Sequence, residues 1–231
     1  MSSVRSKTST PNDAPKEGAA VSEKARVVLA GARAVFLANG FAAATTDMIQ
    51  QAAGVSKSTV YAYYPNKEAL FVAVVEAECA RFLKTINETQ FSGKRLGETL
   101  LAMARAYLEI VLSSDALALF RMVMAEAPRL PELGRRFYVA GPARINAIVA
   151  QRLEIGISNG ELELGGIGLD SAASLFANMV RGEAQMQCLT HPNAQASAVQ
   201  RDQWAKDAVI AFLRALPTKR RAPGNRHADD A

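Results

Sequence analysis

A dense group of hydrogen-bonding side chains lies within residues 45–64, TTDMIQQAAGVSKSTVYAYY. The group combines one lysine with hydroxyl, phenol and amide side chains, and a second lysine follows a few residues later. Its members are Thr45, Thr46, Gln50, Ser56, Lys57, Ser58, Thr59, Tyr61, Tyr63 and Lys67. Side chains of these kinds hydrogen-bond phosphate oxygens and the edges of bases in the major groove. The segment therefore predicts binding to double-stranded DNA.

The order of these residues fits two short helices joined by a tight turn. We expect Thr45 or Thr46 to cap a helix that ends near Ala53, and Ser56 to cap a second helix that ends near Tyr63. Two short helices connected in this way form a helix-turn-helix, whose second helix enters the major groove.

Small and apolar residues supply the packing that such a motif needs. Gly54 provides a turn in the left-handed region without steric cost. Ile49, Ala52 and Val60 are predicted to face one another and the preceding helix. Ala52 and Ala53 are small enough to let the helices cross closely.

The outer face of the second helix carries the predicted DNA contacts. We expect Lys57, Thr59 and Tyr61 to point into the groove, and Thr46 and Lys67 to contact phosphates. The amides at the start of this helix add a partial positive charge that favours phosphate. By pattern alone a structural interpretation stays open, with Lys57 as a solvated side chain and Tyr61 as a packing residue.

The same region resembles the DNA-binding part of the TetR family of transcriptional regulators over about residues 25–75. The resemblance is carried by Phe36, Gly40-Phe41, Thr45-Thr46, Ile49, Ala53-Gly54-Val55-Ser56-Lys57, Thr59, Tyr61, Tyr64, Lys67-Glu68 and Leu70-Phe71. A weaker likeness over residues 119–142 resembles the C-terminal domain of the AefR-like subgroup. Gln50, Ala62 and Tyr64 depart from the usual family residues; Gln50 lies near the groove side, where it could alter operator preference.

Most of the remaining chain is expected to be helical, because Ala and Leu are abundant and no segment shows sustained alternation. The first helix is predicted from the N-cap Ser22 to the stop at Gly40. A kink is expected at Gly141-Pro142 and an N-cap at Asp170. Further helices are predicted over about residues 67–89, 94–113, 115–127, 132–159, 170–189 and 196–216.

These elements predict an all-α fold with two domains. A three-helix helix-turn-helix domain is expected over residues 21–70, and a helical ligand-binding and dimerisation domain over residues 71–217. Residues 1–20 are expected to form a flexible arm and residues 218–231 a disordered tail, because both lack apolar periodicity.

Composition narrows the class of protein. The chain has 231 residues, of which 49% are hydrophobic and 21% are charged, as in ordinary globular proteins. Its longest apolar run is far shorter than the roughly 18 residues that read as a membrane span, and the first twenty residues show no signal-peptide core. Two cysteines suit a reducing compartment. We expect a cytoplasmic protein without a membrane partner, and the net charge of +5 concentrates towards both ends.

The resemblance implies an obligate homodimer whose last two helices form a four-helix bundle with those of the partner. Here these helices run from about Asp170 to Leu189 and from about Ala196 to Leu216. Their apolar stripes contain Leu175, Phe176, Met179, Val180 and Met186 in the first, and Val209, Phe212, Leu213 and Leu216 in the second. The alternative is that both stripes simply close the core of one protomer.

Aromatic and methionine side chains in the second half suggest an adaptable apolar pocket. The candidate ligand-binding residues are Phe120, Arg121, Met124, Phe137, Phe176 and Met179. Arg121 stands among apolar neighbours and needs a partner, either Glu126, Glu183 or an anionic ligand. An ordinary core remains the alternative for each apolar residue.

No catalytic, cofactor-binding or metal-binding motif stands out. The two histidines, His191 and His227, belong to no metal-spaced pair, and no nucleophile elbow or phosphate loop is present. We therefore predict that the chain is not an enzyme. The family resemblance implies a homodimeric repressor, which we expect to be released from a palindromic operator by a small hydrophobic inducer. The alternatives are a helical regulator controlled by a protein partner, and an all-α small-molecule carrier with a vestigial helix-turn-helix.

Overall fold

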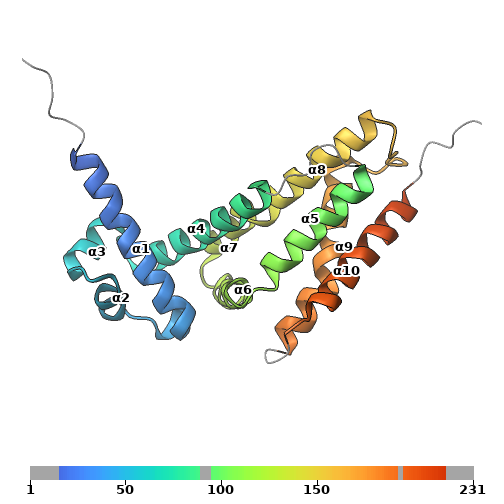
Figure 1. Ribbon diagram of the computed structural model, residues 1–231. Coiled ribbons are helices and arrows are strands. Elements are labelled where there is room, and N and C mark those ends of the chain that lie inside the picture. Colours follow the sequence, from blue (N-terminus) through green and yellow to red (C-terminus); the bar gives the residue numbers. More distant parts are fainter. Residues whose placement is uncertain (1–15, 89–94, 192–194, 217–231) are drawn as a thin grey trace, which may run out of the picture. The chain divides into compact units, whose positions relative to one another are not determined.

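The computed structural model describes residues 16–88, 95–191 and 195–216, and within these ranges the regular structure consists of α-helices without strands (Figure 1). The predicted all-α class is confirmed. The chain divides into two compact units, one up to Val74 and the other from Val75 onward. Helix α4, Lys67–Glu88, runs through this division. The predicted tail, residues 218–231, lies outside the described residues.

The first unit contains α1 (Lys16–Ala43), α2 (Thr46–Ala53), α3 (Lys57–Tyr63) and the beginning of α4. Helix α1 begins at Lys16 and not at Ser22, so the last residues of the expected arm are helical. Residues 1–15 lie outside the described range. Gly40 interrupts α1 with φ +75°, as its predicted role as a stop requires.

Helices α1 and α2 pack closely because α1 has a glycine at the contact point. A Cβ atom added at Gly31 would lie 2.8 Å from both the backbone nitrogen and the Cβ of Ala53. Ala53 therefore permits the crossing as predicted, whereas Ala52 is exposed and does not join the core. Ile49 and Val60 are buried between the helices, as expected.

Three phenylalanines form the centre of the first unit. The rings of Phe36, Phe41 and Phe71 lie with centroids 4.8 to 5.9 Å apart, and all three side chains are buried. Such ring pairs stabilise a small core beyond the area that they bury. They fix α1 and α4 around the helix-turn-helix.

The second unit contains the rest of α4 and six further helices. These are α5 (Leu96–Val111), α6 (Ser114–Glu126), α7 (Pro131–Ala140), α8 (Pro142–Ser158), α9 (Leu169–Thr190) and α10 (Ala198–Ala215). Helices α5, α8, α9 and α10 pack around one apolar core that includes Leu100, Leu153 and Phe176 (Figure 1). Helices α6 and α7 contact each other, and α7 also contacts α8.

Two sequence expectations about helix ends need correction. Gly141-Pro142 separates two helices and does not kink a single one, because Gly141 leaves the helical region (φ −112°, ψ −88°) and Pro142 starts a new helix without needing its N–H. Helix α9 takes Gly168 as its N-cap, so Asp170 lies in the first turn. There its negative charge interacts favourably with the positive end of the helix dipole, although the side chain does not cap the helix.

One stretch of α1, Glu23–Ala43, is long and apolar enough to cross a membrane by length and mean hydropathy alone. Val28, Ala32 and Phe36 within it are fully buried in the first unit. The apolar character of this helix is therefore explained by the core that it forms.

Candidate functional site

Two side-chain caps hold the helix-turn-helix in shape. The Thr45 hydroxyl accepts a hydrogen bond from the backbone N–H of Met48 at 3.2 Å, and the Ser56 hydroxyl accepts one from Thr59 at 3.2 Å. Gly54 adopts a left-handed conformation (φ 64°, ψ 31°) between the helices. The predicted turn and the ends of both helices are confirmed, and they place α3 with its polar residues outward.

Polar groups on α2 and α3 are already engaged with one another. Lys57 Nζ lies 2.9 Å from Asp47 Oδ1, and this hydrogen-bonded carboxylate raises the pKa of Lys57. Tyr61 Oη lies 3.4 Å from Thr46 Oγ1. The Ser56 hydroxyl lies 2.8 Å from those of Ser58 and Thr59. These contacts hold the donors in defined positions. Because exposed ion pairs and hydrogen bonds are weak, DNA could replace the present partners of these side chains.

The predicted DNA contacts other than Lys67 are all at least partly accessible. The exposed members are Thr45, Ser56, Lys57, Ser58 and Tyr61, and the half-buried ones are Thr46, Gln50, Thr59 and Tyr63. Tyr61 is 46% exposed although it is a large aromatic residue, so it is not a packing residue of the core. A face with a cation, hydroxyls and a phenol is suited to phosphates and base edges.

Lys67, predicted to contact a phosphate, makes structural contacts within the first unit. Its ammonium group donates to the backbone carbonyls of Phe41 and Ala44 at 3.0 Å and of Ala42 at 3.4 Å. It also lies 4.5 Å from the centroid of the Phe41 ring. The carbonyls at the end of α1 lack helical partners, so they bind this cation and occupy its three donors.

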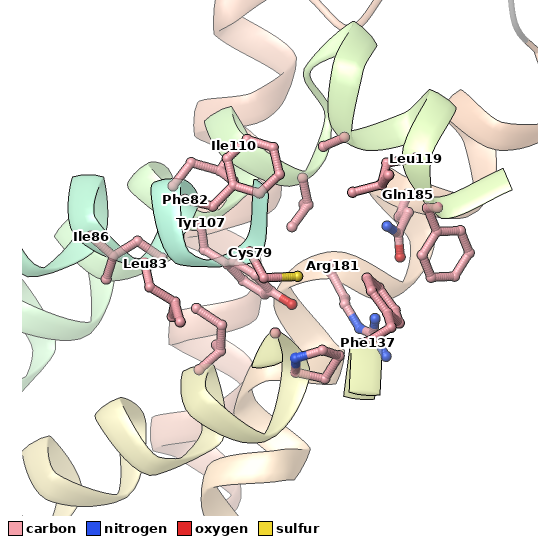
Figure 2. Close-up of a pocket in the computed structure, with 16 residues that line it drawn as sticks. Cys79, Phe82, Leu83, Ile86, Tyr107, Ile110, Leu119, Phe137, Arg181 and Gln185 are labelled. Carbon is pink, nitrogen blue, oxygen red and sulfur yellow. The ribbon is translucent and has the colours of Figure 1, made fainter. Parts of the chain in front are cut away.

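The second unit encloses a cavity of about 610 Å³, including the part open to solvent (Figure 2). It is lined from α4 to α9, mostly by apolar side chains. The lining comprises Cys79, Phe82, Leu83, Ile86, Tyr107, Ile110, Val111, Ala116, Leu119, Phe120, Phe137, Gly141, Pro142, Ile145, Arg181 and Gln185. Its mostly apolar lining with a few polar side chains is typical of a small-molecule pocket.

Only part of the predicted ligand set lines this cavity. Phe120 and Phe137 do, with ring centroids 6.0 Å apart. Phe176 is instead buried in the core against Phe212, at 5.1 Å between centroids. Met124 and Met179 are 45% and 42% exposed on the outside. Helical periodicity identified apolar residues but did not say which face of each helix meets the cavity.

Arg121 is exposed and points away from this pocket. Its guanidinium donates to the backbone carbonyls of Cys188 at 2.9 Å and Leu189 at 3.3 Å, at the end of α9. The predicted pairing with an acid is therefore wrong. Glu126 instead pairs with Arg129 at 2.9 Å, and Glu183 accepts from Gln187. Unpaired carbonyls at a helix end attract a cation as an acid would.

Three polar residues in the pocket were missed from the sequence. Burial raises the pKa of Tyr107, an effect that the neighbouring Arg181 guanidinium partly offsets. Figure 2 shows the Tyr107 hydroxyl directed toward Arg181, while Gln185 lies one turn further along α9. The four-residue spacing of Arg181 and Gln185, which places both on one helix face, was an available signal.

Cys79 contributes an unreactive thiol to the same cavity. Its side chain is 4% exposed, and burial, with added repulsion from Glu78 and Glu76, raises its pKa to about 12. A thiol is nucleophilic mainly as the thiolate. Cys79 is therefore part of the apolar wall. No cluster of three metal-ligating side chains occurs in the described residues.

The predicted interface stripes divide between core and surface. Phe176, Val180, Val209, Phe212 and Leu216 are buried within the protomer, so the core interpretation holds for them. Leu175, Met179 and Met186 on α9 are 50%, 42% and 58% exposed, and Ile210 on α10 is 47% exposed. An apolar face thus remains on these two helices.

Family models match both parts of the chain. The model of the AefR-like transcriptional repressor C-terminal domain matches residues 98–216, just over half of the chain. The model of bacterial regulatory proteins of the tetR family matches residues 28–74.

Curated relatives match a short part of the chain. The chain is 40% identical over 60 residues to the HTH-type transcriptional regulator RutR of Escherichia coli K12, covering 26% of this chain and 28% of RutR. It is 33% identical over 61 residues to the HTH-type transcriptional repressor AcnR of Corynebacterium efficiens, covering 26% and 32%. The chain thus spans less than a third of the length of either relative.

Solved structures match nearly the whole described chain. A TetR-family transcriptional regulator from Mesorhizobium loti superposes with a TM-score of 0.77 at 26% identity, covering 85% of this chain and 98% of that one. The Flavonoid-responsive Regulator FrrA gives a TM-score of 0.71 at 33% identity, covering 86% and 99%.

Proposed function

Because the chain belongs to the TetR family of bacterial transcriptional regulators, we propose that it is a cytoplasmic, homodimeric repressor. In this proposal a small hydrophobic ligand releases it from a palindromic operator. Each protomer places α3 in the major groove, and the two recognition helices bind half-sites about 34–36 Å apart.

The accessible polar face of α2 and α3 is the observation that carries this proposal. Lys57, Ser58 and Tyr61 are exposed there, and the Ser56 and Thr45 caps hold both helices in place. A carrier with a vestigial motif would have no need of this face. We assign Lys57, Thr59 and Tyr61 to the groove and Thr46 to a phosphate.

The apolar face of α9 and α10 supports dimerisation. Leu175, Met179, Met186 and Ile210 leave large side chains exposed on these helices. Covering them with the same face of a second copy forms an isologous interface. Met179→Asp should yield monomers in sedimentation, whereas Val139→Asp, which changes an apolar residue on α7 that is at least as exposed, should remain dimeric.

Helix α4 supports a route for release. It begins in the DNA-binding unit, and Cys79, Phe82 and Leu83 in its second half line the pocket. A ligand that shifts α4 would change the spacing of the recognition helices, to which DNA binding is sensitive. The name of the flavonoid-responsive relative supports an aromatic inducer. The ligand should lower the affinity for DNA by the same factor by which DNA lowers the affinity for the ligand. This coupling free energy is typically about 1–3 kcal/mol.

Operator binding by Lys57 variants tests the proposal. DNA selected from a random library would be titrated with the full chain, Lys57→Ala and the charge-matched control Arg144→Ala in the second unit. We expect Lys57→Ala to weaken binding at least tenfold and to lower the salt slope by about one if Lys57 meets a phosphate. If Lys57 reads a base, the loss should be sequence-selective.

Two results would contradict the proposal. Unchanged affinity in the Lys57, Thr59 and Tyr61 alanine variants would remove the assigned DNA face. Equal ligand affinity with and without operator, for every compound that binds the pocket, would remove the inducer and favour control by a protein partner.

A further inference from the structure

Arg181 is the charged residue in the lining of an otherwise largely apolar pocket. Its Nε and Nη2 atoms donate to Asn178 Oδ1 at 3.2 and 3.0 Å. Among the described residues no carboxylate pairs with its guanidinium. A cation that lies beside apolar walls and has no acidic partner favours the binding of an anionic ligand.

Neighbouring groups complete a polar end of the cavity. Gln185, one turn along α9, is 9% exposed, and its amide makes no hydrogen bond to another residue in the part of the chain that the structure describes. The Tyr107 hydroxyl lies close enough to Arg181 to feel its charge. Figure 2 shows Arg181 and Gln185 on one side of the cavity, with Leu83 and Ile86 at the other end.

Two aromatic rings in the lining suit a flat, apolar body, and Figure 2 shows Phe137 on the same side of the cavity as Arg181. Phe120 and Phe137 pack edge-to-face at 6.0 Å between ring centroids, and Pro142 adds a rigid ring to the lining. Such surfaces pack well against aromatic rings. Asn178 holds the guanidinium in place, so an anion would not have to order it on binding.

We propose that this pocket binds aromatic compounds that carry one anionic oxygen group, a carboxylate or an ionised phenol, with that group held by Arg181 and Gln185. The rings lie against Phe120 and Phe137, and the Tyr107 hydroxyl donates a further hydrogen bond. The inference rests on the proposed ligand pocket and assigns the anion-binding role to Arg181, where the sequence suggested Arg121.

Matched pairs of acids and amides test the role of the charge. The full chain, without DNA, would be titrated calorimetrically with 2-naphthoate and 2-naphthamide, and with 4-phenylbenzoate and 4-phenylbenzamide. Within each pair shape is nearly constant and only the carboxylate carries charge. We expect each acid to bind at least tenfold more tightly than its amide.

Variants assign the effect to one side chain. Arg181→Met should remove the preference for the acids, and Arg181→Lys should retain part of it because the charge remains without the planar fork. Arg144→Met, which removes an exposed cation next to the pocket-lining Ile145, should retain the full preference. If Arg181→Met melts early, Gln185→Leu provides a second variant, expected to lower acid affinity alone.

The outcomes separate this inference from the proposed function. Equal binding of acids and amides, an unchanged preference in Arg181→Met, or no binding of either pair would overturn the inference even if the protein binds its operator. An Arg181-dependent preference for acids would support it even if operator binding were absent.

Discussion

The DNA-binding unit and the regulatory unit bring their functional residues together in different ways. In the first unit the polar face comes from a continuous segment of two short helices, α2 and α3. In the second unit the pocket draws its lining from six helices between α4 and α9, separated by up to about a hundred residues. The first arrangement is fixed by local caps and a turn, whereas the second depends on how long helices rotate against one another.

The close crossing of α1 and α2 at Gly31 should be sensitive to a larger side chain. We expect Gly31→Ala to destabilise the protein by about 2–3 kcal/mol, because the new Cβ would meet the backbone of Ala53 at 2.8 Å. The clash outweighs the usual gain of up to about 1 kcal/mol from replacing a helical glycine by alanine. Urea denaturation of both proteins measures the difference.

Gly97→Ala in the regulatory unit is the matched control. Its new Cβ would meet only the end of the Leu213 side chain, at 3.3 Å, which can move by a few tenths of an ångström. Stability should change little. Equal losses in both variants would show that the α1–α2 crossing has no special requirement for glycine.

The same contrast explains how far the sequence could predict the molecule. The ends of α2 and α3 depend on residues close by in the sequence, namely the caps Thr45 and Ser56 and the turn residue Gly54. The bounds of both helices were therefore predicted nearly to the residue. The structural contacts of Lys67 were not predicted because its partners, the carbonyls of Phe41 and Ala44, lie more than twenty positions away. Long-range contacts of this kind leave no local pattern.

In the regulatory unit periodicity found the helices but not their rotation. Phe120 and Phe176 look alike in sequence, yet one lines the pocket and the other fills the core. The four-residue spacing of Arg181 and Gln185 placed both on one face of a helix but did not show that this face meets a cavity. The pocket's polar end became visible only when Arg181, Gln185 and Tyr107 were placed in one cavity.

Lys67→Met tests whether Lys67 contacts DNA or only stabilises the fold. The methionine retains much of the packing over Phe41 but leaves carbonyls at the end of α1 without their cation, at a cost of about 2 kcal/mol in unfolding free energy. The salt dependence of operator binding should remain that of the parent protein. A salt slope lowered by about one, as for a lost phosphate contact, would restore Lys67 to the DNA interface.

Arg121→Met tests the corrected assignment in the regulatory unit. Loss of its hydrogen bonds to the carbonyls of Cys188 and Leu189 should lower stability by about 1 kcal/mol, since one of these bonds is only partly buried and the other is exposed. The affinity for 2-naphthoate should stay constant, because Arg121 does not line the pocket. Weaker binding of naphthoate but not of naphthamide would return the anion-binding role to Arg121.

The smallest expected effect concerns the ion pair on the DNA-binding face. Lys57 must leave Asp47, 2.9 Å away, before it can contact DNA, and the same carboxylate repels phosphates. Asp47→Asn removes both effects, so operator affinity should rise a few-fold, and more at low salt than at high salt. The exposed pair contributes little to folding, so the melting temperature should barely change.

Glu23→Gln is the control, because it also removes one exposed carboxylate from the first unit, there paired with Arg26 at 2.9 Å. Glu23→Gln should change the operator affinity less than Asp47→Asn does. Combining Asp47→Asn with Lys57→Ala isolates the pair, since the gain from losing competition requires the lysine. An equal gain in the presence and absence of Lys57 would show that Asp47 acts by general repulsion of DNA alone.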